Sequence, residues 1–195
     1  MKLSSYRDGK LLYHLTSLKN LPSIISSGLC SRASLKGKFD DVADSEIIVG
    51  RGAKTLENMV PFHFFAGNPF DGRVLTDHKN KDFCMIAVPR VLAKENNWKI
   101  LPKHPLSSAG VSLVDYNDGM DLIDWELMDK RDYKNTDCKL VCMAECLSPN
   151  TVPANNFRSI AVKDEKTKKE IEKLLTKNNI TNVFVDVNKW YCSIK

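Results

Sequence analysis

Short apolar runs recur along the chain, and each is long enough for one β-strand but too short for an ordinary core helix. They cover 11–16, 59–65, 83–88, 96–101, 139–147, 159–162 and 183–187, with an aromatic pair at 190–191. Helical spacing is clearest after Ser17, where it stops at Gly28, and from Asp164 through Lys177, with shorter stretches near 44–49 and 123–129. Strands that outnumber helices predict an α+β fold, with helices packed at the sides of sheets.

Nothing in the sequence divides the chain: it has no internal repeat, low-complexity block or Pro- or Gly-rich linker. We therefore expect a single domain over 1–195. Lys and Arg number 29 against 24 Asp and Glu, and this net charge of +5 is compatible with a polyanionic partner without establishing one. No apolar run approaches the ~18–20 residues of a membrane span. The polar start lacks the core of a secretory signal, so we predict a cytoplasmic protein without membrane contact.

Three of the six cysteines, Cys138, Cys142 and Cys146, recur at every fourth residue. No two cysteines have the CxxC spacing typical of zinc sites, and the four histidines lie far from these three in the sequence. We therefore predict no metal site and interpret the cysteines as small apolar side chains of a core.

The tetrapeptide Tyr13-His14-Leu15-Thr16 ends the first apolar run. In a strand, His14 and Thr16 point to the same face. An imidazole beside a hydroxyl can hydrogen-bond an amide or a ribose, although a histidine in a half-buried strand is more often structural. The tetrapeptide is therefore a candidate ligand contact, but by itself it does not distinguish a ligand site from a structural histidine.

Glu145 is a lone carboxylate in the apolar run 139–147. Strand alternation places it on one face with Val141 and Met143. Burying a carboxylate without a partner is costly, so Glu145 lies at an edge, pairs with a base or faces a cleft. A carboxylate that faces a cleft fits catalysis.

Two further features favour contact with a charged ligand. Arg51 lies between two glycines, where a close backbone can present its guanidinium to a phosphate or a planar amide; a solvated loop arginine is the alternative. The long segment 102–135 interleaves aromatic and basic residues: Tyr116, Trp125, Tyr133, Lys130, Arg131 and Lys134. This mixture suits single-stranded nucleic acid, whose bases stack and whose phosphates need neutralising, unless Trp125 instead anchors the segment to the core.

The order and spacing of these motifs resemble the DarT family, toxins that ADP-ribosylate DNA. The opening match is Tyr13-His14-Leu15-Thr16 followed by 18–29. Further matches, in the same order, are Val60-Pro61-Phe62-His63-Phe64, Asn68-Pro69, Leu122-Ile123-Asp124-Trp125, Ala144-Glu145 and Trp190-Tyr191. Position 63 is a histidine where the family usually has tyrosine. The similarity spans nearly the whole chain.

The resemblance implies an ADP-ribosyltransferase fold, in which two packed β-sheets surround an NAD cleft with flanking helices. It implies Glu145 and Arg51 as catalytic residues. The implied NAD contacts are His14, Leu15, Thr16, Ser23, Arg51 and His63. The stretch 112–139 would be the loop that selects the substrate, and the implied DNA contacts in it are Tyr116, Trp125, Lys130, Arg131 and Lys134.

The reaction that the resemblance implies is transfer of ADP-ribose from NAD to thymine or guanine of single-stranded DNA, with release of nicotinamide and no metal. The implied protein partner is a DarG-like macrodomain antitoxin that removes the modification. Two other functions remain open at this point. One is an ADP-ribosyltransferase that acts on RNA or protein, and the other is a non-catalytic module that binds nucleic acid.

Overall fold

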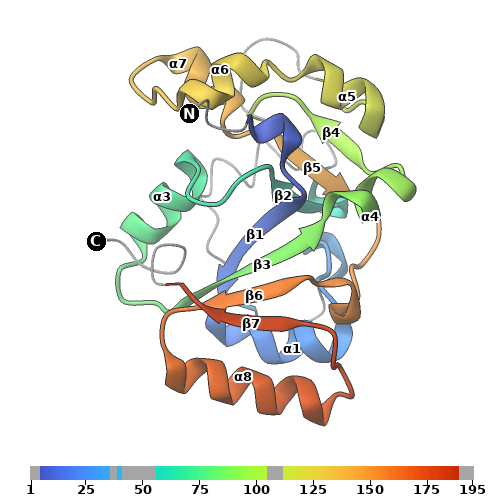
Figure 1. Ribbon diagram of the computed structural model, residues 1–195, viewed down its shortest axis with the longest axis vertical. Helices are drawn as coiled ribbons and strands as arrows, with labels where there is room; N and C mark the ends of the chain where they lie inside the picture. The colour runs from blue at the N-terminus through green and yellow to red at the C-terminus, as the bar shows by residue number, and fades with distance from the viewer. Residues whose placement is uncertain (1–4, 36–38, 41–55, 105–111, 189–195) are drawn as a thin grey trace.

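A seven-stranded sheet in the order β4-β5-β2-β1-β3-β6-β7 runs through the molecule (Figure 1). The computed structural model describes residues 5–35, 39–40, 56–104 and 112–188. The strands are β1 Leu11–Ser17, β2 Val60–His63, β3 Phe83–Pro89, β4 Lys99–Leu101, β5 Glu145–Ser148, β6 Ser159–Val162 and β7 Phe184–Val187. Neighbouring strands are antiparallel except β6 and β7, which are parallel and joined by a helix.

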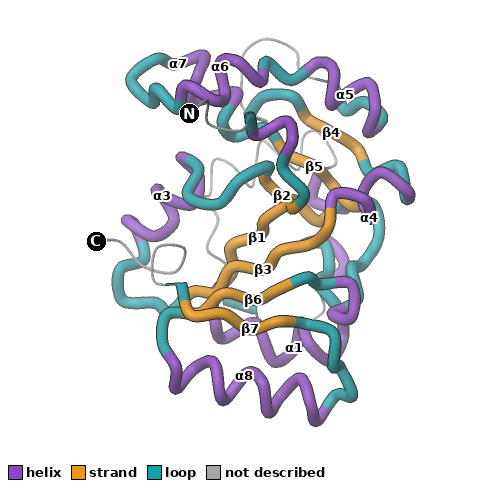
Figure 2. Tube along the Cα trace, viewed as in Figure 1, coloured by secondary structure: helices purple, strands orange, loops and turns teal. Residues whose placement is uncertain are grey.

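Helices gather at both ends of the sheet (Figure 2). They are α1 Leu21–Ser27, α3 Pro69–Asp77, α4 Arg90–Glu95, α5 Tyr116–Leu122, α6 Trp125–Lys130, α7 Thr136–Val141 and α8 Glu165–Lys177. α5, α6 and α7 lie at the end of β4 and β5, whereas α1 and α8 lie at the end of β7, and α3 lies to one side (Figure 1). Within the described ranges, no helix has the length and apolar character to cross a bilayer.

The α+β class is confirmed, but the sheet differs from the two packed sheets that the resemblance implies. All seven strands belong to one hydrogen-bonded sheet. β1 and β3 pair along their whole length, from Leu11 to Ser17. Among the described residues, β1 and β2 share only one register pair, Tyr13 with His63. Within the described residues, the two halves of the sheet, β4-β5-β2 and β1-β3-β6-β7, therefore share a single main-chain register pair.

The predicted strand over 139–147 is wrong in its first part. The chain is helical over Thr136–Val141, and β5 begins only at Glu145. Asn135 caps α7, because its Oδ1 accepts a hydrogen bond of 2.9 Å from the N–H of Cys138. The buried residues Cys138, Val141 and Cys142 have the i, i+3, i+4 spacing of a helix. The fourfold cysteine spacing is thus a helical signal.

Besides α7, three helices have no counterpart in the prediction: α3, α4 and α5. The start of α3 had a signal in the sequence: Asn68 is its cap, accepting hydrogen bonds from the N–H groups of Phe70 and Asp71, and Pro69 follows at the first position. The predicted helix near 44–49 and the terminal strand at Trp190-Tyr191 lie outside the described residues.

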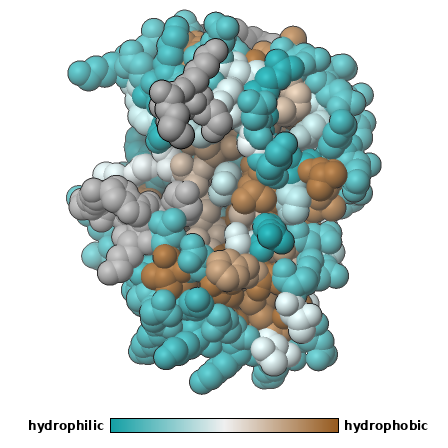
Figure 3. Space-filling view, viewed as in Figure 1, coloured by the Kyte–Doolittle hydropathy of each residue, from teal (hydrophilic) through white to brown (hydrophobic). Residues whose placement is uncertain are grey.

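The sheet buries apolar side chains on both faces. Leu12, Phe62 and Ile86 belong to the larger cluster, which includes α1, whereas Leu15 and Met85 pack in a smaller cluster with α3. In Figure 3, hydrophobic side chains gather across the middle of the visible face, between hydrophilic surfaces at its two ends. The middle of the sheet is therefore the part of this face with the most apolar surroundings.

Two helical glycines make a matched test of this packing. A Cβ at Gly119 of α5 would lie 2.3 Å from the Cβ of Ile100 on β4, whereas a Cβ at Gly72 of α3 meets nothing within 4 Å. We expect Gly119→Ala to lower the free energy of unfolding by about 1–3 kcal/mol, because the core must shift. Gly72→Ala should raise it by about 0.5–1 kcal/mol through helix propensity. Urea unfolding measures both, and equal responses would contradict the packing of α5 on β4.

A candidate active site around Glu145

Glu145 is the first residue of β5, between β2 and β4, and is only 5% exposed. It is the register partner of His63 on β2 and of Leu101 on β4. This position excludes the edge that the sequence left open for this carboxylate. The strand register, rather than proximity in sequence, brings Glu145 beside His63.

One row of side chains crosses the sheet through Glu145. Directly opposed residues on neighbouring strands present their side chains to the same face. The pairs Tyr13 with His63 and His63 with Glu145 therefore place these three side chains on one face, in that order. His63 Nδ1 lies 3.2 Å from the carbonyl oxygen of Ala144, which precedes Glu145. The row brings together two residues predicted for the active site.

The start of α3 supports this row. The His63 ring lies 5.3 Å from the Phe70 ring. The buried Asp71 carboxylate accepts hydrogen bonds from the Gly67 N–H (2.8 Å) and from Asn68 Nδ2 (3.0 Å). Burial raises the pKa of Asp71, while the nearby His63 opposes that rise. The turn after β2 is thereby fixed close to His63.

His14 occupies the place where β1 and β2 separate. Its Nδ1 lies 2.8 Å from the carbonyl oxygen of Pro61, and its ring lies 5.7 Å from that of Phe62. Because the main chains pair only at Tyr13 and His63 in the described part, this side chain supplies a second polar link between the strands. His14 is therefore partly buried and held in one orientation.

The other predicted NAD contacts have different surroundings. Thr16 is buried and accepts a hydrogen bond from Asn20 Nδ2 (3.3 Å), whereas Leu15 is buried in the cluster beside α3. Ser23 is exposed on α1, and its hydroxyl donates to the carbonyl of Asn20 (2.8 Å). Thr16 and Ser23 thus both adjoin Asn20, which the sequence did not indicate.

Arg51, the second predicted catalytic residue, lies outside the described residues. The stretch 34–52 that leads to it is described at 34–35 and 39–40. The role of Arg51 accordingly stays a prediction.

Tyr116 and Trp125, two of the predicted DNA contacts, are each 6% exposed. The Trp125 indole N–H donates to the carbonyl of Met120 (2.7 Å), and its ring meets Phe64 edge to face at 5.2 Å. Stacking on a base would require both rings to leave the core. The structure places Trp125 as the anchor of its segment, the alternative considered above.

The basic residues Lys130, Arg131 and Lys134 are exposed at and after the end of α6. Arg131 donates to the hydroxyls of Tyr133 (3.0 Å) and Tyr6 (3.2 Å) and lies over the Phe65 ring, 5.3 Å from its centre. Tyr6 in turn stacks on Phe65, with ring centres 4.4 Å apart. We call Tyr6, Phe65, Arg131 and Tyr133 the aromatic–arginine cluster. Sequence analysis missed Tyr6 and Phe65 because they lie far from Arg131 in the chain.

No group of His, Cys, Asp and Glu side chains that could hold a metal ion occurs within the described ranges. Burial raises the pKa of the Cys142 thiol to about 12 and also raises that of Cys146. Burial in the core thus favours the protonated form of both thiols, as is typical of unreactive structural cysteines.

Comparisons with known proteins show what this sequence is similar to. The sequence profile of the family described as "ssDNA thymidine ADP-ribosyltransferase, DarT" matches residues 13–192. A DNA ADP-ribosyl transferase–DNA ADP-ribosyl glycohydrolase fusion protein of Thermosipho africanus is 25% identical over 184 residues. That match covers 87% of this chain but only 46% of the fusion protein, so the chain spans less than half of that relative.

Solved structures share the fold. Thermus sp. 2.9 DarT in complex with ADP-ribosylated ssDNA superposes with a TM-score of 0.81 at 18% identity, over 96% of this chain and 99% of that one. The same protein in complex with NAD+ superposes with a TM-score of 0.75 at 18% identity, over 94% of this chain and 98% of that one. Thermosipho africanus DarTG in complex with ADP-ribose superposes with a TM-score of 0.71 at 23% identity, over 93% of this chain and 50% of that one.

Proposed function

The chain belongs to the DarT family of ssDNA thymidine ADP-ribosyltransferases, and on that premise we propose that its single domain over 1–195 transfers ADP-ribose from NAD to a base of single-stranded DNA. Thymine is the favoured acceptor because the family description names thymidine. Guanine is the alternative base. The observation that carries the proposal is the buried Glu145 on β5, directly beside His63 on β2.

The chemistry assigns Glu145 a role in two events. The bond between nicotinamide and ribose breaks with its electron pair on nicotinamide, which leaves positive charge on the ribose. A carboxylate stabilises that charge where it develops, and more strongly in apolar surroundings than in water. The base nitrogen then bonds to the ribose carbon, and its proton passes to Glu145. His63, a member of the row, and His14, on β1, are the proposed contacts for the nucleotide.

The aromatic–arginine cluster is the proposed contact for the DNA strand, with Lys130 and Lys134 beside it. Arg131 presents a cation among aromatic rings, and Tyr133 is 37% exposed. Bases stack on such rings and phosphates bind such cations. Chemistry on a base also requires that the base leave its stack, which costs least in a single strand.

The proposed protein partner is a macrodomain antitoxin of the DarG type that removes the modification. The Thermosipho africanus relative joins a transferase and a glycohydrolase in one chain, which supports this pairing. We propose a cytoplasmic location for this activity.

One experiment separates the proposed acceptors. The protein is incubated with NAD and, separately, with oligodeoxynucleotides that contain one thymine or one guanine, with RNA and with protein. Mass spectrometry should find one added ADP-ribose on the thymine oligonucleotide together with free nicotinamide. Modification of RNA or protein alone would contradict the DNA assignment. Salt-sensitive DNA binding without nicotinamide release would instead identify a non-catalytic module.

We expect Arg51→Ala to lower the transfer rate at least about tenfold, because a lost cation weakens the hold on the NAD pyrophosphate or on the base. Initial rates at saturating DNA measure the effect. The matched control is Arg73→Ala, which removes an exposed arginine that pairs with Asp77 on α3; this variant should keep its activity. A loss below tenfold for Arg51→Ala, with a larger one for Arg73→Ala, would assign the role to Arg73.

A further inference from the structure

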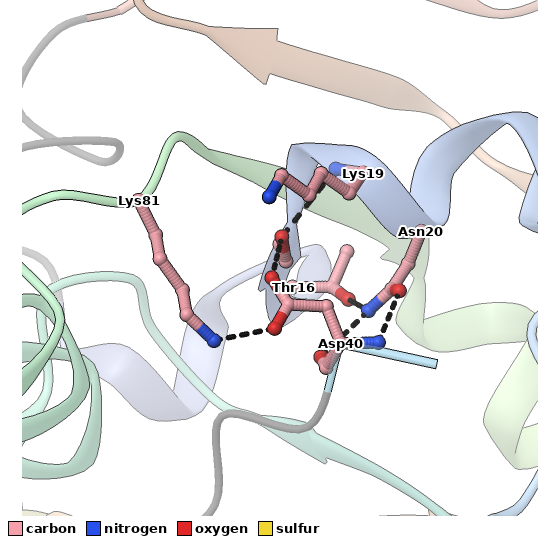
Figure 4. A network of polar contacts seen from close by, with 6 residues as sticks. Thr16, Lys19, Asn20, Asp40 and Lys81 are labelled. Carbon is pink, nitrogen blue, oxygen red and sulfur yellow. Dashed lines mark hydrogen bonds and ion pairs between the residues drawn. The ribbon is translucent and has the colours of Figure 1, made fainter. Parts of the chain in front are cut away.

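The side-chain amide of Asn20 is held by the main chain of a residue twenty positions further along the sequence. Asn20 Oδ1 accepts a hydrogen bond from the N–H of Asp40 (2.9 Å), and Asn20 Nδ2 donates to the carbonyl of Asp40 (3.0 Å). The second hydrogen of Nδ2 goes to Thr16 Oγ1 (3.3 Å). Figure 4 shows these contacts at the end of β1. A main-chain N–H can only donate, so the orientation of this amide is determined by its partners.

Asp40 is itself fixed through its carboxylate. Ser17 Oγ donates to one carboxylate oxygen (2.7 Å), and Lys81 Nζ pairs with the other (Figure 4). The hydrogen bond from Lys81, followed by that from Ser17, lowers the pKa of Asp40, so this carboxylate stays ionised at neutral pH. The network therefore joins the end of β1, the turn before β3 and the chain at Asp40.

The consequence concerns the hydrogen of the Thr16 hydroxyl. Since Asn20 Nδ2 must donate, Thr16 Oγ1 must accept, and its own O–H is left to donate in another direction. Among the described residues, no hydrogen bond uses this O–H. Thr16 lies on the same strand face as His14, two residues away.

We propose that Asn20 and Asp40 are positioning residues that orient the Thr16 hydroxyl as a hydrogen-bond donor to NAD. Neither residue touches the nucleotide in this proposal; both act through Thr16. It rests on the proposed function, because Thr16 is a predicted NAD contact. It also adds a requirement, namely that the effect of Asn20 on NAD affinity depends on the Thr16 hydroxyl.

A double-mutant cycle tests this requirement. NAD binding is measured by calorimetry, and the KM for NAD and kcat by nicotinamide release, for wild type, Asn20→Ala, Thr16→Ala and the double variant. We expect Asn20→Ala to weaken NAD binding about tenfold when Thr16 is present. A tenfold change in affinity corresponds to the loss of one oriented hydrogen bond. In the Thr16→Ala background the same substitution should cost less than about twofold. The KM should rise while kcat changes little.

Asn20→Asp is the second variant, in case the alanine form is unstable. It is isosteric and keeps an acceptor for the Asp40 N–H, but it removes the donor to Thr16 and to the Asp40 carbonyl. We expect at least the same loss of affinity, since the new carboxylate accepts the Thr16 proton. Lys163→Met, which breaks the exposed ion pair with Asp82, is the control and should leave the KM unchanged. Thermal unfolding shows that each variant is folded.

Equal losses from Asn20→Ala in both backgrounds would overturn the positioning role, as would unchanged NAD affinity in the Asn20 variants. These outcomes leave the proposed function intact. A wild-type protein that neither binds NAD nor releases nicotinamide would instead refute the proposed function, so the two failures are distinguishable.

Discussion

Glu145→Gln is expected to abolish ADP-ribose transfer, lowering kcat by about 10³-fold, because it removes the negative charge that stabilises the ribose cation. The amide has the size of the carboxyl group and fits the same place in β5. We therefore expect the variant to keep the wild-type unfolding temperature and its NAD affinity. Transfer to a labelled oligonucleotide, single-turnover kinetics and calorimetry measure these three quantities.

The matched control is Glu126→Gln, which neutralises an exposed glutamate on α6. It should retain wild-type transfer, because its carboxylate lies at the surface. Wild-type activity in Glu145→Gln would remove Glu145 from the mechanism. A parallel loss of activity and of folding would mean that Glu145 is structural, and the unfolding temperature separates this outcome from a catalytic one.

Arg90→Ala should lower the free energy of unfolding by about 3–5 kcal/mol, the second large effect that we expect. The guanidinium is buried and donates to the carbonyls of Leu11 (3.1 Å), Arg7 (3.0 Å) and Phe64 (2.9 Å). It also lies over the rings of Phe64 and Trp125, at 5.1 and 5.8 Å. Alanine leaves three carbonyl groups without this donor and a cavity between the rings.

Arg7→Ala is the control, because Arg7 makes an exposed ion pair with Asp121 (2.7 Å) and keeps its main-chain carbonyl when truncated. This change should cost less than about 1 kcal/mol. The free energy of unfolding of Arg90→Lys should be closer to that of Arg90→Ala than to that of the wild type, since an ammonium group cannot reproduce the planar fork of donors. Denaturant unfolding measures all three variants, and similar stabilities for Arg90→Ala and Arg7→Ala would contradict this account of Arg90.

The sequence is sufficient to predict a helix or strand where the interactions that determine it are local. Short apolar runs bounded by turn residues predict β1, β3 and β6. The cap at Asp164 and the helical spacing of apolar residues after it predict α8. α7 was missed because its short apolar run fits both a strand and a helix, and packing of Cys138 and Cys142 decides between them. Such short runs are ambiguous from periodicity alone.

The candidate site likewise combines residues that have a local signal with contacts that have none. Residue type and context predict Glu145 and the Tyr13–Thr16 motif as site residues, and this stays a prediction. Their arrangement was not predicted, because the pairing of His63 with Glu145 is a property of strand register over 82 positions of chain. The contacts of Arg131 with Tyr6 and Phe65 likewise join segments that no local window contains.

The lone pairing of Tyr13 with His63 has a mechanical consequence. Bending a sheet along a fully bonded strand boundary strains many ladder hydrogen bonds. Bending it here strains one register pair and the side-chain bonds of His14 and Arg90 that cross the boundary. The proposed catalytic carboxylate, Glu145, belongs to one side of this boundary, and the proposed nucleotide contacts His14 and Thr16 belong to the other. A small rotation between the two sides would change the distance between this carboxylate and the nucleotide while leaving both halves folded.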